Sequence, residues 1–418
     1  MSTNGRRRVV VTGLGMVSPC GLNVAETWEN VRNGRSGVRR IEGFEMPEGC
    51  VNIAGQVRGF DPAEYLDRKT IRRTDRFAHL SMAAAAQAIA DAELDVRADA
   101  ARIGCSIGTG IGGIQTQEVA HAKLFEAGPD RLSPFWVTAL IANMGAAEVS
   151  MMYGTKGPLT TECTACAASN MSLGNALMYI RAGMADVMLA GGVEAPIAPL
   201  ALGGFGTMRA LSRRLDDPEG ASRPFDAGRD GFVLSEGSAV LVLEELERAQ
   251  GRGARIIGEM LGYGLSSDAH HLTEPDPVGE SPARAMRMAM DDAGLTPADI
   301  QYVNAHATST PVGDSGETRA LKLALGEEHA RQVPISATKG VTGHMLGAAG
   351  AIEAGFTLLA MRDGFLPPTI NQTDPDPDCD LDYVPNVGRS ADIEYAVSNS
   401  FGFGGHNAVL VLRRWSGP

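Results

Sequence analysis

Short apolar runs alternate with longer helical stretches along nearly the whole chain. Runs rich in Val, Ile and Leu predict strands over residues 7–12, 102–107, 186–191, 238–244, 302–306, 394–399 and 408–412. The stretches between them predict helices over residues 78–92, 170–183, 281–294, 316–325 and 347–362. Strands that alternate with helices are typical of parallel sheets covered by helices, so the pattern predicts an α/β fold.

Two of the predicted helices, 78–92 and 170–183, consist mainly of small or apolar residues and are nearly uncharged. A helix that is apolar on every side is buried on every side. We therefore expect a core helix that lies between two sheets.

A faint internal repeat indicates how the chain is organised. Residues 159–183 and 335–364 each consist of a predicted strand, a turn that contains Thr, a helix of small residues and an Arg-x-Gly ending. The repeat predicts two similar halves, residues 1–256 and 257–418. No flexible linker separates them, so we expect the halves to pack together.

Composition and charge narrow the class of protein. The chain has 418 residues, 44% of them hydrophobic, which is enough for a large core. A net charge of −13 argues against nucleic acid or an anionic membrane as the main partner. No apolar stretch approaches the roughly 20 residues of a membrane helix, and the basic-then-apolar beginning predicts a first strand rather than a signal peptide. Six irregularly spaced cysteines do not form a disulfide framework, so we expect a cytoplasmic protein.

Cys166 is the first candidate for chemistry. It ends the run TTECTAC and begins the predicted buried helix 170–183. A thiol at a helix N-terminus feels the positive end of the helix dipole, which favours the thiolate. The alternative is a small buried cysteine, as we predict for Cys20, Cys105 and Cys379. The residues around Cys166 leave both interpretations open.

Three other patterns suggest binding sites but have weak support. Cys163 and Cys166 form a single CxxC, without the second pair that a zinc site needs. The run GTGIGG at 108–113 matches a dinucleotide-binding pattern, but no acidic residue follows about 20 positions later. The acidic loop 372–382 is typical of a solvated surface turn. We therefore expect no metal and no nicotinamide cofactor.

Two of the eight histidines lie in polar, glycine-containing segments. His306 ends a predicted strand in YVNAHATSTPVGD, and His344 lies in ATKGVTGHMLGAAGAIE between Lys339 and Glu353. One such histidine alone is more often a core residue than a catalytic one. Two of them, with a lysine and a cysteine at a helix start, suit an enzyme that holds a thioester and stabilises an enolate.

These segments closely resemble the elongating β-ketoacyl-acyl carrier protein synthases, in particular type II of bacterial fatty acid synthesis. The similarity extends over nearly the whole chain, from VVVTGLGMVSPCG (9–21) to NSFGFGGHNAVLVL (399–412). Between them lie GTGIGGI, TACAAS, GGFGTMRALS, SRPFDAGRDGFVLSEG, SSDAHHLT, VNAHATSTPVGD and KGVTGHMLGAAGAIE. Each motif is moderately specific, and their joint order is very specific.

The resemblance implies a thiolase-like five-layered αβαβα fold with two pseudo-duplicated halves, and a homodimer. It also implies decarboxylating condensation of an acyl thioester with malonyl-acyl carrier protein. Cys166 would be the nucleophile, His306 and His344 the active-site histidines, and Lys339 the residue that orients and charges the site. Phe403 would be a gate whose N–H forms the oxyanion hole with that of Cys166.

The resemblance also implies the roles of surrounding residues. Those expected to contact the phosphopantetheine arm are Thr273, Thr308 and Thr310. The acyl pocket would be walled by Ile111 and Phe205, with Glu353 as a buried structural acid and Asp268 on a second mobile gate. No cofactor is expected, because the phosphopantetheine belongs to the carrier.

Two basic clusters are candidates for docking that acidic carrier. One comprises Arg68, Lys69, Arg72, Arg73 and Arg76, and the other comprises Arg209, Arg213 and Arg214. From the residues alone, an ordinary solvated helix face is the favoured interpretation. The resemblance predicts that one of the clusters docks the carrier.

Two departures and three rivals stand beside this hypothesis. Ala307 replaces a glycine common after the first histidine, and His406 stands where threonine is frequent. A ketosynthase of a type II polyketide system shares all the motifs. A thiolase needs a second catalytic cysteine late in the chain, but Cys379 lies in an acidic loop without glycines. The hypothesis of a nicotinamide-dependent dehydrogenase is supported by GTGIGG alone.

Overall fold

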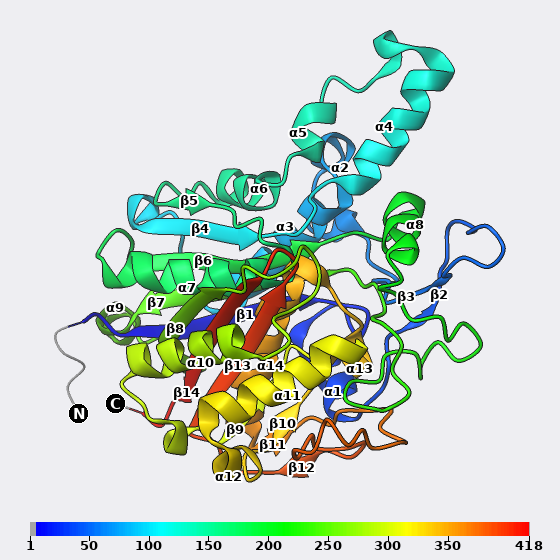
Figure 1. Cartoon of the computed structure of the whole chain (residues 1–418). Coiled ribbons are helices and arrows are strands. Elements are labelled where there is room, and N and C mark those ends of the chain that lie inside the picture. The colour runs from blue at the N-terminus through cyan, green and yellow to red at the C-terminus, as the bar shows by residue number, and fades with distance from the viewer. Residues whose placement is uncertain (1–5, 418) are drawn as a thin grey trace.

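The computed structural model describes residues 6–417, and a mixed ten-stranded sheet runs through it (Figure 1). In sheet order, the strands are β10 (Ile335–Ser336), β9 (Tyr302–Asn304), β13 (Tyr395–Gly402), β14 (His406–Arg414), β8 (Gly258–Ser267), β1 (Val9–Val17), β7 (Gly237–Glu245), β6 (Val187–Glu194), β4 (Ile103–Gly108) and β5 (Leu159–Thr160). Two small ribbons lie apart from it: β2 (Arg39–Arg40) with β3 (Ile53–Ala54), and β11 (Phe365–Leu366) with β12 (Arg389–Ser390).

The α-helices within the described residues are α1 (Val24–Arg32), α2 (Arg68–Arg73), α3 (Arg76–Asp91), α4 (Ile114–Ala127), α5 (Trp136–Leu140), α6 (Met144–Tyr153), α7 (Ala168–Arg181), α8 (Pro199–Thr207), α9 (Leu246–Gly251), α10 (Glu280–Ala293), α11 (Pro311–Leu325), α12 (Glu327–Ala330), α13 (Lys339–Thr342) and α14 (Ala349–Asp363). None of them is both long and apolar enough to cross a membrane.

The sheet consists of two halves with the same strand order. If the five strands of each half are numbered in chain order, both half-sheets have the spatial order 3-2-4-5-1, read from the outer edge to the centre. The first strands, β1 and β8, meet at the centre, where Val9 pairs with Met260 and Val11 with Gly258. This repeat confirms the pseudo-duplicated fold. The exact boundary between residues 256 and 257 stays a prediction.

The expectation of parallel sheets was wrong for most of the strand pairs. Only β4 with β5 and β6, and β9 with β10 and β13, are parallel; the other pairs of the large sheet are antiparallel. The apolar pattern locates a strand but carries no information about its direction. The turn between β13 and β14 is too short for a crossover, so those strands must run antiparallel.

Three layers of helices and the two half-sheets make the five layers. On the outer faces, α3 packs on β1 and β7, and α10 packs on β8 and β14. In the middle, α7 and α14 contact each other and strands of both half-sheets. The prediction that 170–183 is a core helix is confirmed. Helix 78–92 instead covers an outer face, although most of its residues are buried.

Close approach of helix and sheet requires glycine at matching places in the two halves. A Cβ at Gly15 of β1 would lie 2.0 Å from the Ala84 carbonyl of α3, and one at Gly264 of β8 would lie 2.0 Å from the Ala285 carbonyl of α10. The glycines that make β8 fit its helix also weaken its apolar alternation. That is why β8 was not among the predicted strands.

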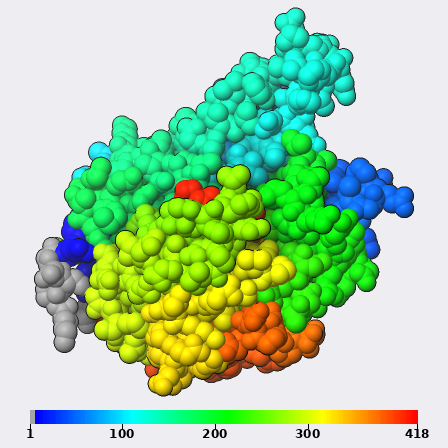
Figure 2. All heavy atoms as spheres, viewed as in Figure 1, coloured from blue at the N-terminus to red at the C-terminus, as the bar shows by residue number. Residues whose placement is uncertain are grey.

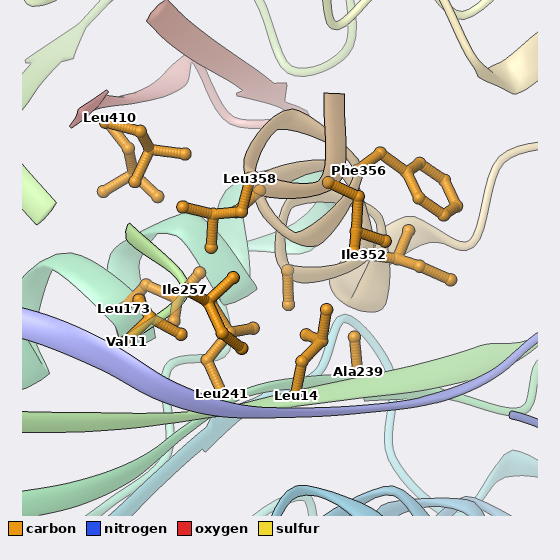
Figure 3. Close-up of a cluster of buried hydrophobic side chains, with 14 of the residues drawn as sticks. Val11, Leu14, Leu173, Ala239, Leu241, Ile257, Ile352, Phe356, Leu358 and Leu410 are labelled. Atoms are coloured by element: carbon orange, nitrogen blue, oxygen red, sulfur yellow. The ribbon is translucent and has the colours of Figure 1, made fainter. Parts of the chain in front are cut away.

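Apolar side chains on α14 fill the centre of the molecule. Ile352, Phe356 and Leu358 are buried and belong to one apolar cluster with Leu14 of β1 and Leu241 of β7 (Figure 3). Burial on both sides explains why this helix has no polar face. It is therefore a rigid support for the segment that precedes it, which carries His344.

A helical arm projects from this body. It contains α4, drawn in cyan, and α5; α4 stands clear of the sheets in Figure 1, and the same segment projects from the surface in Figure 2. Several large apolar side chains on the arm are exposed, among them Val119, Phe125 and Val137. The arm was not predicted, because its mixed sequence lacks a strong apolar period.

Candidate active site

Cys166 lies on a sharp turn between β5 and α7. The turn is a single 3-10 turn, Ala165–Ala167, and Ala165 has a φ of 49°, which is unusual for a residue other than glycine. The second half repeats the geometry at Leu346–Ala348, where Leu346 has a φ of 42°. A strained residue at the same place in both halves indicates that the fold requires this turn.

The thiol of Cys166 is only 6% exposed. Burial raises its pKa to about 12, while the charge of Lys339 and the backbone N–H groups of Phe403 and Cys166 act in the opposite direction. Burial therefore outweighs the effect that a helix N-terminus was expected to have. The resting sulfur is a thiol that must lose its proton when it reacts.

His344 and His306 lie beside the sulfur. The Nε2 atom of His344 is 2.9 Å from Cys166 Sγ, and the rings of the two histidines are edge to face with centroids 5.4 Å apart. Burial and the nearby Lys339 charge hold the pKa of both imidazoles well below the ordinary value. Both rings are therefore neutral near pH 7. Phe232 packs against His344, and Phe401 packs against His306.

Lys339 and Glu353 form a buried ion pair behind the histidines. Each side chain is 1% exposed. Burial raises the pKa of Glu353 to about 7, and the lysine charge opposes that rise. The structure therefore brings five predicted residues together: Cys166, His306, His344, Lys339 and Glu353.

A cavity of about 510 Å³ opens onto the sulfur and the two histidines. The other predicted residues that line it are Ile111, Phe205, Arg209, Asp268, Thr273, Thr308, Thr310 and Phe403. Because its lining combines apolar side chains with threonine hydroxyl groups, it is suitable for an acyl thioester.

The two predicted gates are hydrogen-bonded to each other. Phe403 begins the turn between β13 and β14, in which Gly404 and Gly405 have φ of 83° and 75°. The N–H of Gly404 donates to the Leu272 carbonyl at 2.8 Å, and the N–H of Asp268 donates to the Gly405 carbonyl at 3.0 Å. A movement of either loop must therefore break contacts with the other.

The segment that carries Thr308 and Thr310 is held rigidly. Ser309 between them has a φ of 70°. Its N–H donates to Asp314 at 3.1 Å, its hydroxyl accepts from the Arg223 N–H at 2.9 Å, and its carbonyl accepts from the Gly231 N–H. These bonds fix the two threonine hydroxyls 3.2 Å apart at the cavity wall.

Comparison with known proteins gives the family. The family model of the β-ketoacyl synthase N-terminal domain matches residues 6–249, and that of the C-terminal domain matches residues 257–373. The chain belongs to the β-ketoacyl synthase family.

Curated relatives within this β-ketoacyl synthase family match over their full length. The chain is 50% identical to 3-oxoacyl-[acyl-carrier-protein] synthase 2 of Staphylococcus aureus strain COL, covering 99% of this chain and 100% of the relative. It is 47% identical, with the same coverage, to the protein of that name from Synechocystis sp..

A solved structure of the family agrees with the fold. It is a ketosynthase of a type II PKS in complex with its acyl carrier protein, bound to the hexaketide. The TM-score is 0.91 at 38% identity, covering 98% of this chain and 100% of that one. The thiolase-like fold is thereby confirmed.

The basic residues predicted to dock a carrier lie in two places on this β-ketoacyl synthase. Arg209 is exposed at the cavity lining, whereas α2, with the exposed Arg68, Lys69 and Arg72, is not part of that lining. Arg73 is half-buried and lies 3.5 Å from Glu148. Arg209 is thus placed to meet whatever enters the cavity, and Arg73 is partly occupied by an acid.

Two buried acids of the site were not predicted. Glu317 accepts the N–H groups of His306 and Ala307 at 2.9 and 2.7 Å and so fixes the backbone of His306. Glu194, at the end of β6, accepts the Gly110 and Gly347 N–H groups at 2.6 and 2.9 Å. In the sequence both resemble ordinary acids, because their role is to accept hydrogen bonds from backbone N–H groups of other segments of the chain.

Proposed function

We propose that this chain catalyses the decarboxylating Claisen condensation of fatty acid elongation. It would join an acyl group held on Cys166 to malonyl-acyl carrier protein and form β-ketoacyl-acyl carrier protein. The observation that carries the proposal is the 2.9 Å contact of Cys166 Sγ with His344 Nε2, beside His306, at the cavity. The name and full-length 50% identity of the curated relatives support elongation of fatty acids.

In the first half-reaction, Cys166 attacks the acyl thioester that the carrier delivers. The thiol proton passes to the departing phosphopantetheine sulfur, and His344 Nε2 is close enough to relay it. The N–H groups of Cys166 and Phe403, which already lie against the sulfur, would stabilise the tetrahedral oxyanion. Each such donor is worth about 3–4 kcal/mol in comparable sites.

In the second half-reaction, malonyl thioester loses CO₂ and becomes an enolate. A neutral imidazole can donate a hydrogen bond to the enolate oxygen, and both histidines are neutral near pH 7 because their pKa is low. The enolate carbon then attacks the acyl-cysteine carbonyl and displaces the Cys166 thiolate, which takes up a proton from solvent and becomes the resting thiol. Lys339 contributes by keeping both rings in the neutral form.

The partner proposed for these steps is acyl carrier protein. Arg209 at the cavity opening and the exposed basic side chains of α2 offer positive charge on a chain of net charge −13. Thr308 and Thr310 would contact the phosphopantetheine, with Thr273 as a further contact. No resident cofactor is required, since the carrier brings the acyl group.

We also propose a cytoplasmic homodimer. Strand β5 is the unpaired edge of the large sheet, and exposed apolar side chains lie on it and on the neighbouring helices: Leu159, Met151, Met152 and Met178. An unprotected edge beside an apolar patch is suited to pairing with a second copy. All six cysteines are free, which supports a reducing compartment.

The test is mass spectrometry of the intact protein after incubation with acyl carriers of graded chain length. We expect one acyl group on the wild type and none on Cys166→Ala. Cys166→Gln should still release CO₂ from malonyl carrier without condensation. Condensation by Cys166→Ala would refute the proposal, and assembly of polyketide-length products by the wild type would favour the type II polyketide alternative.

A further inference from the structure

The three reactive side chains of the cavity also form a set of metal ligands. The sulfur of Cys166 and one ring nitrogen each of His306 and His344 lie within 4.8 Å of one another, and all three residues are buried. Zn²⁺ binds Cys sulfur at about 2.3 Å and His nitrogen at about 2.0–2.1 Å, so a tetrahedral site separates sulfur from nitrogen by about 3.5 Å. The observed separation of Cys166 Sγ from His344 Nε2 is 2.9 Å. This contact must therefore open by about 0.6 Å, and any pair of ligand atoms near the 4.8 Å limit must move closer together.

The ring nitrogens are available for this binding. A metal binds imidazole through a ring nitrogen that carries no proton, and each ring offers one nitrogen to the set. Among the described residues, the Nδ1 atom of neither ring has a hydrogen-bond partner. Moving the ring proton from Nε2 to Nδ1 therefore breaks no hydrogen bond at Nδ1, and it frees the Nε2 lone pair for a metal.

The surroundings suit a cation that enters from the cavity. Three buried acids, Glu194, Glu317 and Glu353, lie around the site, and Lys339 is paired with one of them. The three ligands line the cavity, so a fourth coordination position faces open space. Three protein ligands and one open position are the arrangement of an accessible zinc site.

We propose that Cys166, His306 and His344 bind Zn²⁺, or a divalent ion of similar softness, and that this binding competes with acylation. The S–H bond of Cys166 breaks, a Zn–S bond forms, and the proton leaves to solvent without any change of oxidation state. Metal binding follows from the site geometry alone. Only its inhibitory consequence rests on the proposed acyl transfer.

Binding is tested with Co²⁺ as a spectroscopic probe on the full chain. We expect one equivalent of Co²⁺ to give thiolate-to-metal absorption and the visible bands of a tetrahedral ion, Zn²⁺ to displace it, and about one proton to be released per Zn²⁺ in weak buffer. Cys166→Ser should lose the thiolate band, and His344→Ala should bind roughly 100-fold more weakly.

The matched control is Cys163→Ser, which removes an exposed cysteine three residues away. It should bind Co²⁺ as the wild type does. The proposal is overturned if Co²⁺ does not bind, if Cys166→Ser keeps the thiolate band, or if Cys163→Ser removes it.

Inhibition is measured separately, as the rate of Cys166 acylation in Cys163→Ser with and without a saturating amount of Zn²⁺. We expect saturation to stop acylation and prior acylation to prevent Co²⁺ binding. Unchanged acylation at full Zn²⁺ occupancy would refute the competition. Absence of acylation even without metal would instead refute the proposed function and leave the binding result standing.

Discussion

The buried ion pair between Lys339 and Glu353 permits a sharp test of the site's electrostatics. Lys339→Met keeps the length of the side chain but removes its charge, and it leaves Glu353 buried without a counter-charge. Breaking a buried pair by removing one partner costs about 3–5 kcal/mol. We expect urea unfolding at pH 8, where the wild-type carboxylate is ionised, followed by tryptophan fluorescence, to show a loss of that size.

The loss should depend on pH in a definite direction. Glu353 has a pKa of about 7 with the lysine present, so without it the carboxyl remains protonated to higher pH. A raised folded-state pKa contributes stability that is present below the unfolded value, about 4.3, and is lost as the pH rises through the folded value. Below about pH 7 the carboxyl is protonated in both folded proteins, so the difference between wild type and Lys339→Met should be nearly constant between pH 5 and pH 7 and should grow as the pH rises above about 7.

A double-mutant cycle supplies the control. In Lys339→Met with Glu353→Gln, neither charge remains, so the double variant should be more stable than the sum of the two single losses predicts. The same lysine holds down the pKa of Cys166, so alkylation of that thiol in a Cys163→Ser background should slow in Lys339→Met. The reasoning fails if the single variant loses under about 1 kcal/mol and the two losses simply add.

Three further substitutions test other parts of the molecule. Burial raises the pKa of Glu194 to about 7, so the stability contributed by its protonated form is lost as the pH rises from about 4.3 through 7. The free energy of unfolding of Glu194→Gln in urea should therefore rise relative to that of the wild type over this interval. A difference that does not change with pH would contradict this. In Gly402→Ala, the new Cβ would lie 2.8 Å from the Thr164 carbonyl and 3.1 Å from the Cys166 N–H nitrogen, so acylation followed by intact mass should slow by roughly 100-fold with the fold retained. Phe356→Ala empties the fully buried centre of α14 and should cost about 3–5 kcal/mol in urea unfolding; a loss below about 1 kcal/mol would mean that the site collapses freely.

The sequence predicted well what depends on strong local patterns. Strands β1, β6, β7 and β14 carry continuous apolar runs, and each begins within two residues of its predicted start. Strand β8 was missed because its glycines, which admit α10, interrupt such a run. Strand direction was predicted wrongly, since it depends on the connections and not on hydrophobicity.

The same distinction applies to the site. Cys166, His306, His344 and Lys339 could be proposed because scarce residue types stand in unusual local contexts, and the family resemblance joined them. Glu194 acts through N–H groups from two distant segments, and no local context distinguishes it from a surface acid. The high pKa of the Cys166 thiol was also not predicted, because burial depends on the packing of both halves.

The repeated turn explains why only one of the two halves carries a nucleophile. Counted from the strained residues Ala165 and Leu346, the position that corresponds to Cys166 in the second half is Gly347. A Cβ on Gly347 would lie 2.3 Å from the Gly110 nitrogen, so the second half has no room for any side chain there. The two halves thus share the backbone of this turn but not its chemistry. The first half carries the thiol there, whereas in the second half the glycine lets the loop at Gly110 pack directly against the turn.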